Sequence, residues 1–198
     1  MSANIGTQPA PAAIQLPRTT GAKPFFIWAG LMVLGIPLAG YLGWGVAGHV
    51  DSVAPALIGG ALTGAGIGLA QCVMLRRSLG VGLEWIVATS VGLAVGLAIG
   101  AALVGYETTT SQIAIMGAIQ GAFVGIAQGM VLRNKFSLWH VWMVAMPVFF
   151  SIGWVVTDVV IDSGKQFTVF GASGSIVFAI LSGLLLMAGM SGKKSASE

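Results

Sequence analysis

Six long apolar segments constrain this chain of 198 residues more than any other feature. They cover residues 24–47, 54–75, 82–105, 112–132, 138–161 and 168–190. A helix needs roughly 20 apolar residues to cross the hydrocarbon of a bilayer. Only 8% of the residues are charged, too few to cover a water-soluble globule. The pattern predicts an all-α membrane protein with six transmembrane helices. Because the connections are short, neighbouring helices should form antiparallel hairpins.

Basic residues fall almost entirely on one side of this predicted layout. Eight of the nine lie there: Arg18, Lys23, Arg76, Arg77, Arg133, Lys135, Lys193 and Lys194. Cytoplasmic loops carry an excess of lysine and arginine, so both chain termini should be cytoplasmic. Residues 1–22 and 191–198 are then cytoplasmic tails around a membrane domain of residues 23–190. Tryptophans near the ends of the spans, including Trp28, Trp85 and Trp142, suggest an aromatic belt at the membrane interface.

The chain also repeats itself. The stretch GALTGAGIGLAQCVMLR, which begins at Gly60, recurs 57 residues later as GAIQGAFVGIAQGMVLR. Tryptophans at 28, 85 and 142 have the same spacing, and a weaker third copy ends the chain at a shift of 58. Fixed-period similarity indicates tandem structural units. We expect three two-helix hairpins, at about residues 24–79, 80–136 and 137–190, arranged as a bundle with approximate threefold symmetry.

Glycines recur every fourth residue within the repeated stretch. They are Gly60, Gly64 and Gly68 in the first copy, and Gly117, Gly121 and Gly125 in the second. In lipid, small residues drive association because they let helix backbones approach closely. These stripes should therefore be packing surfaces, and we expect the second, fourth and sixth helices to meet through them at a shared centre.

Polar side chains accompany the glycine stripes. Gln71 and Gln128 are equivalent in the repeat, and Gln120 is equivalent to Thr63. The first pair can bond to each other or to backbone carbonyls, which would be a structural role. The alternative is that all four line a narrow vestibule or ligand cavity. The structural role is the stronger interpretation, because Leu186 replaces the third glutamine.

Few ionisable residues lie near the spans. Glu84 is expected to pair with Arg76, Arg77 or Arg133, with an ion or proton site as the alternative. Asp158 lies one turn inside the predicted end of its helix and should reach toward water. The two histidines, His49 and His140, are predicted at opposite membrane faces, so they cannot jointly hold one haem. Each could singly ligate a pigment or a metal, although a wetted interfacial role fits better.

No chemistry-bearing constellation stands out in the sequence. There is no nucleophile paired with a base, no cluster with metal-ligand spacing and no phosphate-binding loop after a strand. The one cysteine, Cys72, excludes an intramolecular disulfide. We therefore expect a protein that is not an enzyme and has no metal site, and the sequence specifies no cofactor. Nothing in the charge pattern suggests nucleic acid as a partner.

The two repeated stretches resemble uncharacterised bacterial multi-pass membrane proteins. In those, small-residue helices end in Ala-Gln and then Leu-Arg, and the next helix opens with tryptophan. The likeness spans about residues 54–155 and implies a bacterial plasma membrane, but no activity, substrate or catalytic residue. Partners are then the bilayer and other membrane subunits, or further copies of the chain.

Three functions are compatible with these features. The first is a non-enzymatic accessory or scaffold subunit of a larger membrane complex. The second is a passive channel or transporter for a small neutral or lipid-like solute, passing near Gln71, Gln120 and Gln128. The third is a binder of pigment or another hydrophobic cofactor, which an absorbance spectrum would reveal.

Overall fold

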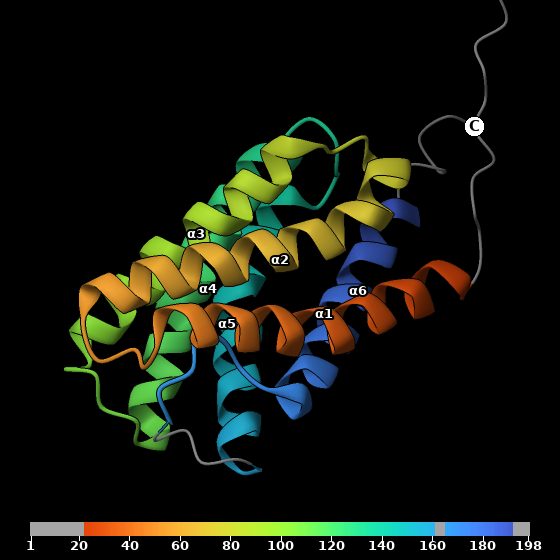
Figure 1. The fold of residues 1–198 in the computed structure, drawn as a ribbon. Coiled ribbons are helices and arrows are strands. Elements are labelled where there is room, and N and C mark those ends of the chain that lie inside the picture. Colours follow the sequence, from red (N-terminus) through yellow and green to blue (C-terminus); the bar gives the residue numbers. More distant parts are fainter. Residues whose placement is uncertain (1–21, 161–164, 192–198) are drawn as a thin grey trace, which may run out of the picture.

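A computed structural model describes residues 22–160 and 165–191 of the chain. Its secondary structure over this range consists of helices joined by loops (Figure 1). The helices are α1 (Lys23–Ala47), α2 (Val53–Leu79), α3 (Leu83–Leu103), α4 (Thr110–Leu132), α5 (Trp139–Asp158) and α6 (Ala172–Ser191). All six are long and apolar enough to cross a membrane. The predicted class and number of spans are therefore confirmed, whereas the predicted tails at 1–22 and 191–198 lie almost wholly outside the described residues.

Helix ends follow local chemistry where the loops are short. Pro24 occupies the first turn of α1, where its missing N–H costs nothing. Gly48 follows α1 and Gly80 follows α2, both with positive φ, which glycine adopts without strain. The predicted bounds of the last two spans are wrong. Helix α5 ends at Asp158 rather than near 161, and α6 begins at Ala172 rather than at 168.

The helices pack in a closed ring. Each contacts its neighbours in chain order, and α1 also packs against α6. No two even-numbered helices are among the packed pairs within the described part of the chain. We call the end that carries residues 48–52, 104–109, 159–160 and 165–171 the hairpin end. The opposite end, with Lys23, Arg76, Arg77, Arg133 and Lys135, is the basic end.

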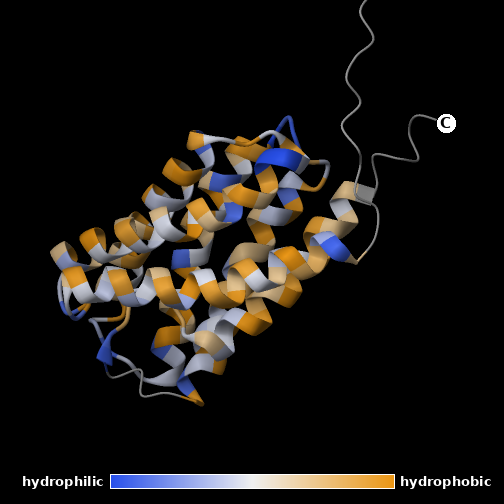
Figure 2. Cartoon of the chain, turned by 45° about the vertical axis from the view of Figure 1, so that its right-hand side comes forward, coloured by the Kyte–Doolittle hydropathy of each residue, from blue (hydrophilic) through white to orange (hydrophobic). Residues whose placement is uncertain are grey.

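The outer surface of the ring is apolar. Figure 2 shows hydrophobic residues along all six helices, with hydrophilic residues mainly in the loops. Large exposed side chains on this surface include Leu34, Leu38, Leu42, Leu62, Leu69, Val91, Ile126, Val148 and Leu184. Such a surface suits contact with acyl chains, where apolar exposure carries no penalty.

The glycine stripes do not meet at a shared centre, so that expectation is wrong. A Cβ atom on Gly60 or Gly64 would lie 2.6–2.7 Å from the backbone of α3. One on Gly121 would overlap the carbonyl oxygen of Met146 in α5. Each stripe thus serves the seam between its helix and the next helix in the chain. Close approach there is possible only because the side chain is a hydrogen atom.

Larger side chains fill the centre of the ring in layers. On each odd-numbered helix, residues four apart in sequence face the axis of the ring. Equivalent residues on successive odd-numbered helices are 57 positions apart. Three such layers are Trp28, Trp85 and Trp142; Met32, Thr89 and Met146; and Ile36, Leu93 and Phe150, all at most 3% exposed. The predicted aromatic belt is wrong for these three tryptophans, because they form the core rather than the lipid interface.

Candidate functional site

The layer nearest the basic end is a cluster of three tryptophans. The ring of Trp142 lies 6.4 Å from that of Trp28 and 6.3 Å from that of Trp85, between centroids. A buried indole N–H needs an acceptor, because an unpaired donor in lipid costs free energy. Two of the three find it on the preceding even-numbered helix. Trp85 donates to Gln71 Oε1 at 2.9 Å, and Trp142 donates to Gln128 Oε1 at 3.0 Å.

The two glutamines then reach across the centre through their amide groups. Gln128 Nε2 donates to Gln71 Oε1 at 3.1 Å and to Thr89 Oγ1 at 2.9 Å. Gln71 Nε2 points at the sulfur of Met32, 3.5 Å away, and Met32 is the repeat equivalent of Thr89. Both glutamines are 1% exposed. The structure therefore brings them together as a paired, buried network.

The third repeat closes this network differently. Leu186 stands where a glutamine would be, so Trp28 lacks the acceptor that Trp85 and Trp142 have. Instead, the indole of Trp28 donates to Ser182 Oγ at 3.0 Å, one helical turn away from Leu186. Ser182 in turn donates to the carbonyl oxygen of Phe178 at 2.6 Å. The serine replaces the missing amide and leaves the indole paired.

The half of the centre nearer the hairpin end is closed by a non-helical segment, residues 165–171. Figure 1 shows it leading from the hairpin loops to the first turn of α6. Its Thr168 is fully buried. The Thr168 hydroxyl lies 2.8 Å from Thr63 Oγ1 and donates to the carbonyl of Gly40 at 3.2 Å. The backbone carbonyl of Thr168 accepts from Gln120 Nε2 at 3.0 Å. Trp154 completes the set by donating to Gln120 Oε1 at 2.9 Å.

The space for this segment comes from two departures from the repeat. Residues 110–113 form the first turn of α4, but their equivalents at a shift of 58, residues 168–171, stay unwound before α6. On α1, Gly40 stands where α3 has Leu97 and α5 has Trp154. A Cβ atom on Gly40 would lie 2.6 Å from Val169 Cγ1. Val169 therefore occupies part of the volume that a side chain on α1 would fill.

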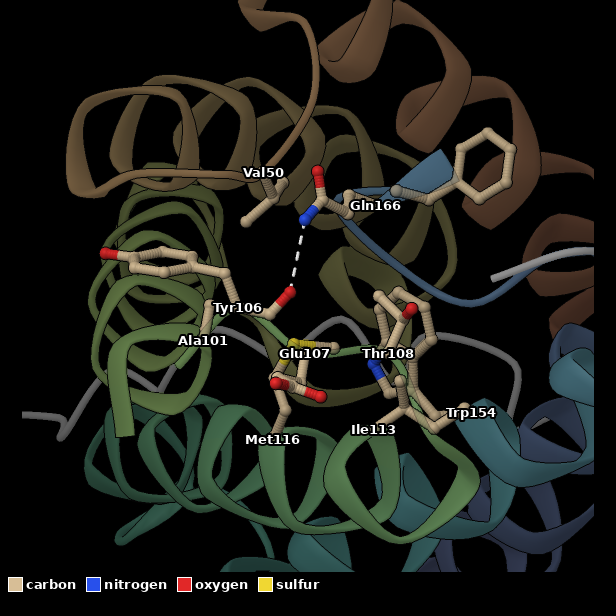
Figure 3. A pocket seen from close by; sticks show the side chains of 10 residues that line it. Val50, Ala101, Tyr106, Glu107, Thr108, Ile113, Met116, Trp154 and Gln166 are labelled. Carbon is tan, nitrogen blue, oxygen red and sulfur yellow. Dashed lines mark hydrogen bonds between the residues drawn. The ribbon is translucent and has the colours of Figure 1, made fainter. Parts of the chain in front are cut away.

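Gln166 joins the three hairpin loops (Figure 3). Its backbone carbonyl accepts from the N–H of Val50 at 3.1 Å, and its side-chain amide donates to the carbonyl of Tyr106 at 3.1 Å. Gln166 and Tyr106 are the two described non-glycine residues with positive φ, at 51° and 60°. Such conformations persist only where surrounding contacts hold them. The bond between these two residues is one such contact.

Glu84 lies at the basic end and pairs with a residue that the sequence did not suggest. Its Oε1 is 2.7 Å from Lys135 Nζ and also accepts from the backbone N–H of Gly82 at 3.0 Å. Lys135 donates in addition to the carbonyl of Gly80 at 3.1 Å. The predicted pairing with Arg76, Arg77 or Arg133 is wrong. This pair ties the start of α3 to the loop after α4 and is half-exposed to solvent.

Asp158 and the two histidines occupy the ends of the bundle. Asp158 is the last residue of α5, and its Oδ2 accepts from Thr110 Oγ1 at 2.6 Å. His49 is exposed at the hairpin end, with Nδ1 2.9 Å from the carbonyl oxygen of Lys165. His140 is exposed at the basic end against Trp139. The histidines lie at opposite ends, and each has an aromatic neighbour.

Two recesses lie at the hairpin half of the molecule. One lies among the loops beside Gln166, Tyr106 and Glu107, and it has room for about one water molecule (Figure 3). The other opens sideways between α1 and residues 167–171 and is lined mainly by apolar groups. Neither includes Gln71, Gln128, Gln120 or Thr63. Among residues 22–160 and 165–191, no group of three histidine, cysteine, aspartate or glutamate residues could hold a metal ion.

Comparisons of the chain with protein-family models, with curated proteins and with solved structures found no match. The assignment of a function therefore depends on the geometry alone. The sequence pattern singled out Gln71 with Gln128 and Gln120 with Thr63, but it gave no hint of Thr168, Ser182 or Gln166. For Ser182 a signal existed, since the loss of glutamine at 186 leaves Trp28 without its acceptor.

Proposed function

We propose that this protein is a non-enzymatic integral membrane protein that serves as an accessory or scaffold subunit of a larger membrane complex. In this proposal three tandem hairpins surround a pseudo-threefold axis. Both termini are cytoplasmic, and the membrane is a bacterial plasma membrane. The basic end then faces the cytoplasm, as the distribution of lysine and arginine favours.

The observation that carries the proposal is the filled and hydrogen-bonded centre. Tryptophan, methionine and glutamine side chains occupy the half nearer the basic end, and residues 165–171 occupy the other half. The buried polar side chains of both halves bond to one another or to backbone carbonyls. A centre of this kind stabilises one arrangement of the helices and leaves the apolar outer surface as the main area available to partners.

Gentle-detergent purification from native membranes tests this role. The expected result is another membrane protein in fixed stoichiometry, whose abundance falls when the gene for this chain is deleted. A deletion that changes no other membrane protein, together with a strictly solitary monomer in native membranes, would contradict the proposal.

A transporter for a small neutral or lipid-like solute is a second candidate, favoured by one observation. The half of the centre nearer the hairpin end is closed by a non-helical segment rather than by a helix, and such a segment can move without breaking helical hydrogen bonds. Solute flux into vesicles would be compared between the wild type, Gln120→Leu, which faces the segment, and the paired variants Gln71→Leu and Gln128→Leu. Flux that is equal in vesicles with and without the protein would reject this candidate.

A further inference from the structure

The lateral recess beside residues 167–171 differs from the rest of the outer surface, because it is a notch rather than a packed seam. It is lined by Pro37, Gly40, Tyr41, Phe167, Val169, Phe170 and Gly171. Its floor exists because Gly40 has no side chain, and Val169 fills only part of the space. The notch lies at the depth of the apolar spans and faces outward between α1 and the segment before α6.

Between the notch and the hairpin end, the side chains change from apolar to aromatic and then to charged. Trp44 lies one turn beyond Tyr41, toward the hairpin end, and packs against Phe167 at 5.6 Å between ring centroids. The carbonyl oxygen of Lys165 accepts from Trp44 Nε1 at 3.2 Å and lies 2.9 Å from His49 Nδ1. Lys165 and His49 are both exposed. An apolar slot is thus followed by an amphipathic aromatic level and then by an exposed ammonium group.

This order matches the order of groups in a phospholipid, from acyl chain through glycerol to phosphate. Lys165 is the one lysine or arginine at the hairpin end of the described chain, and its ammonium complements a negatively charged headgroup. Asp51 and Glu107, in residues 48–52 and 104–109 at the same end, carry the opposite charge and would repel such a headgroup. We propose that this notch binds one acyl chain of an anionic phospholipid whose headgroup is held by the ammonium group of Lys165, beside the rings of Trp44 and His49.

The site is independent of the scaffold role, since it needs only the bilayer around the protein. A partner helix would require a longer apolar groove than these seven lining residues provide. Tyr41, at 68% exposure, forms one wall, and its neighbour Leu42, at 67%, lies outside the notch. The two residues therefore provide a matched pair of substitutions that leave the core untouched.

Quenching of tryptophan fluorescence tests the proposal. Trp28, Trp85, Trp142 and Trp154 are at most 1% exposed, whereas Trp44 lies beside the notch and Trp139 lies at the other end. The full chain would be placed in phosphatidylcholine bilayers that contain a small fraction of phosphatidylglycerol brominated near the headgroup end of its chains. The difference between the wild type and Trp44→Phe isolates the signal of Trp44.

We expect Trp44 to be quenched as if the anionic lipid were enriched about fivefold over random mixing, the effect of one basic residue near an anionic headgroup. Lys165→Gln should remove most of this enrichment, and Tyr41→Ala should lower it. Leu42→Ala and Arg77→Gln should leave it unchanged. Quenching at the random level would overturn the proposal, and so would equal effects of Lys165→Gln and Arg77→Gln. Trp44 shielded from every brominated lipid would indicate that a protein partner covers the notch instead, which also overturns it.

Discussion

The two halves of the bundle centre are built by different means. Near the basic end, helices alone fill the axis, and Trp85 and Trp142 each bond to a glutamine 14 residues earlier in the chain. Near the hairpin end, residues 165–171 fill the axis, and Thr168 bonds to three different helices. The half near the basic end thus contains the same tryptophan–glutamine hydrogen bond twice. The half near the hairpin end depends on one non-helical segment that has no counterpart in the other hairpins.

This difference teaches how a repeated sequence can close a ring without keeping its symmetry. The three hairpins have nearly the same length. In the third, however, the residues equivalent to the first turn of α4 belong to the buried segment before α6 instead of to a helix. Helix backbones are held by internal hydrogen bonds and yield little, whereas a non-helical segment can shift. The half near the basic end should therefore be the stiffer and more sensitive of the two.

Replacing a glutamine in each half gives the largest expected contrast. Gln128→Leu removes the acceptor of Trp142 and the bonds to Thr89 and Gln71, and should lower the free energy of unfolding by about 3 kcal/mol. Gln120→Leu should cost about half as much, because residues 165–171 can move to pair Trp154 and the carbonyl of Thr168. Unfolding in mixed micelles titrated with denaturing detergent measures both. An equal or larger loss of unfolding free energy for Gln120→Leu would show that the half near the basic end is not the more sensitive one.

Adding a methyl group to buried glycines should sharpen the same contrast. Gly68→Ala places a Cβ atom 2.9 Å from Ile86 Cα in α3, and the resulting overpacking should cost about 2 kcal/mol. Gly40→Ala meets the side chain of Val169, which can shift, and should cost about 1 kcal/mol.

Gly30 provides the matched control for both glycine substitutions, because a Cβ atom there would have no neighbour within 4 Å. Gly30→Ala should be neutral or stabilising, by up to about 1 kcal/mol, through its higher helix propensity. The same unfolding titration compares the three variants. If Gly30→Ala lowered the free energy of unfolding as much as Gly68→Ala, the loss would not come from close packing between α2 and α3.

The third repeat can be returned to the pattern of the other two. Ser182→Val matches Ile67 and Val124 at the equivalent positions, but it leaves the indole of Trp28 unpaired and should cost about 1.5 kcal/mol. Adding Leu186→Gln should recover at least half of that loss, since the amide then stands where Gln71 stands relative to Trp85. The double variant is compared with each single variant in a thermodynamic cycle. Independent, additive effects would show that the introduced amide does not replace the serine.

Releasing Gln166 should have the smallest effect on stability and the most local one. Gln166→Ala removes the bond to the carbonyl of Tyr106 and should cost about 0.5 kcal/mol. Amide hydrogen exchange should increase in residues 165–171 and stay unchanged in α3 and α4. Gln112→Ala, at the same end but bonded to Thr109, is the control. Faster exchange throughout the bundle would mean that the segment supports both halves.

Much of the fold could be predicted, because span length and the 57-residue spacing are properties of the linear sequence. The pairing of Gln71 with Gln128 was within reach for the same reason. The partner of Glu84 was not, because three arginines and Lys135 all lie at the same predicted face of the membrane as Glu84. The buried segment at 165–171 was hidden by its composition, since Phe167, Val169 and Phe170 look like the first turn of a span.

The amino-acid sequence is enough to predict six apolar helices and to mark the positions that recur between hairpins. Which way each helix faces depends on how the helices pack. In water, an amphipathic pattern separates the buried face from the exposed one. In lipid, the solvent is as apolar as the core, so the hydrophobic pattern does not distinguish the tryptophans at the centre from the leucines outside. Close contacts at glycine and the pairing of buried N–H groups make that choice, and they form only when the helices pack together.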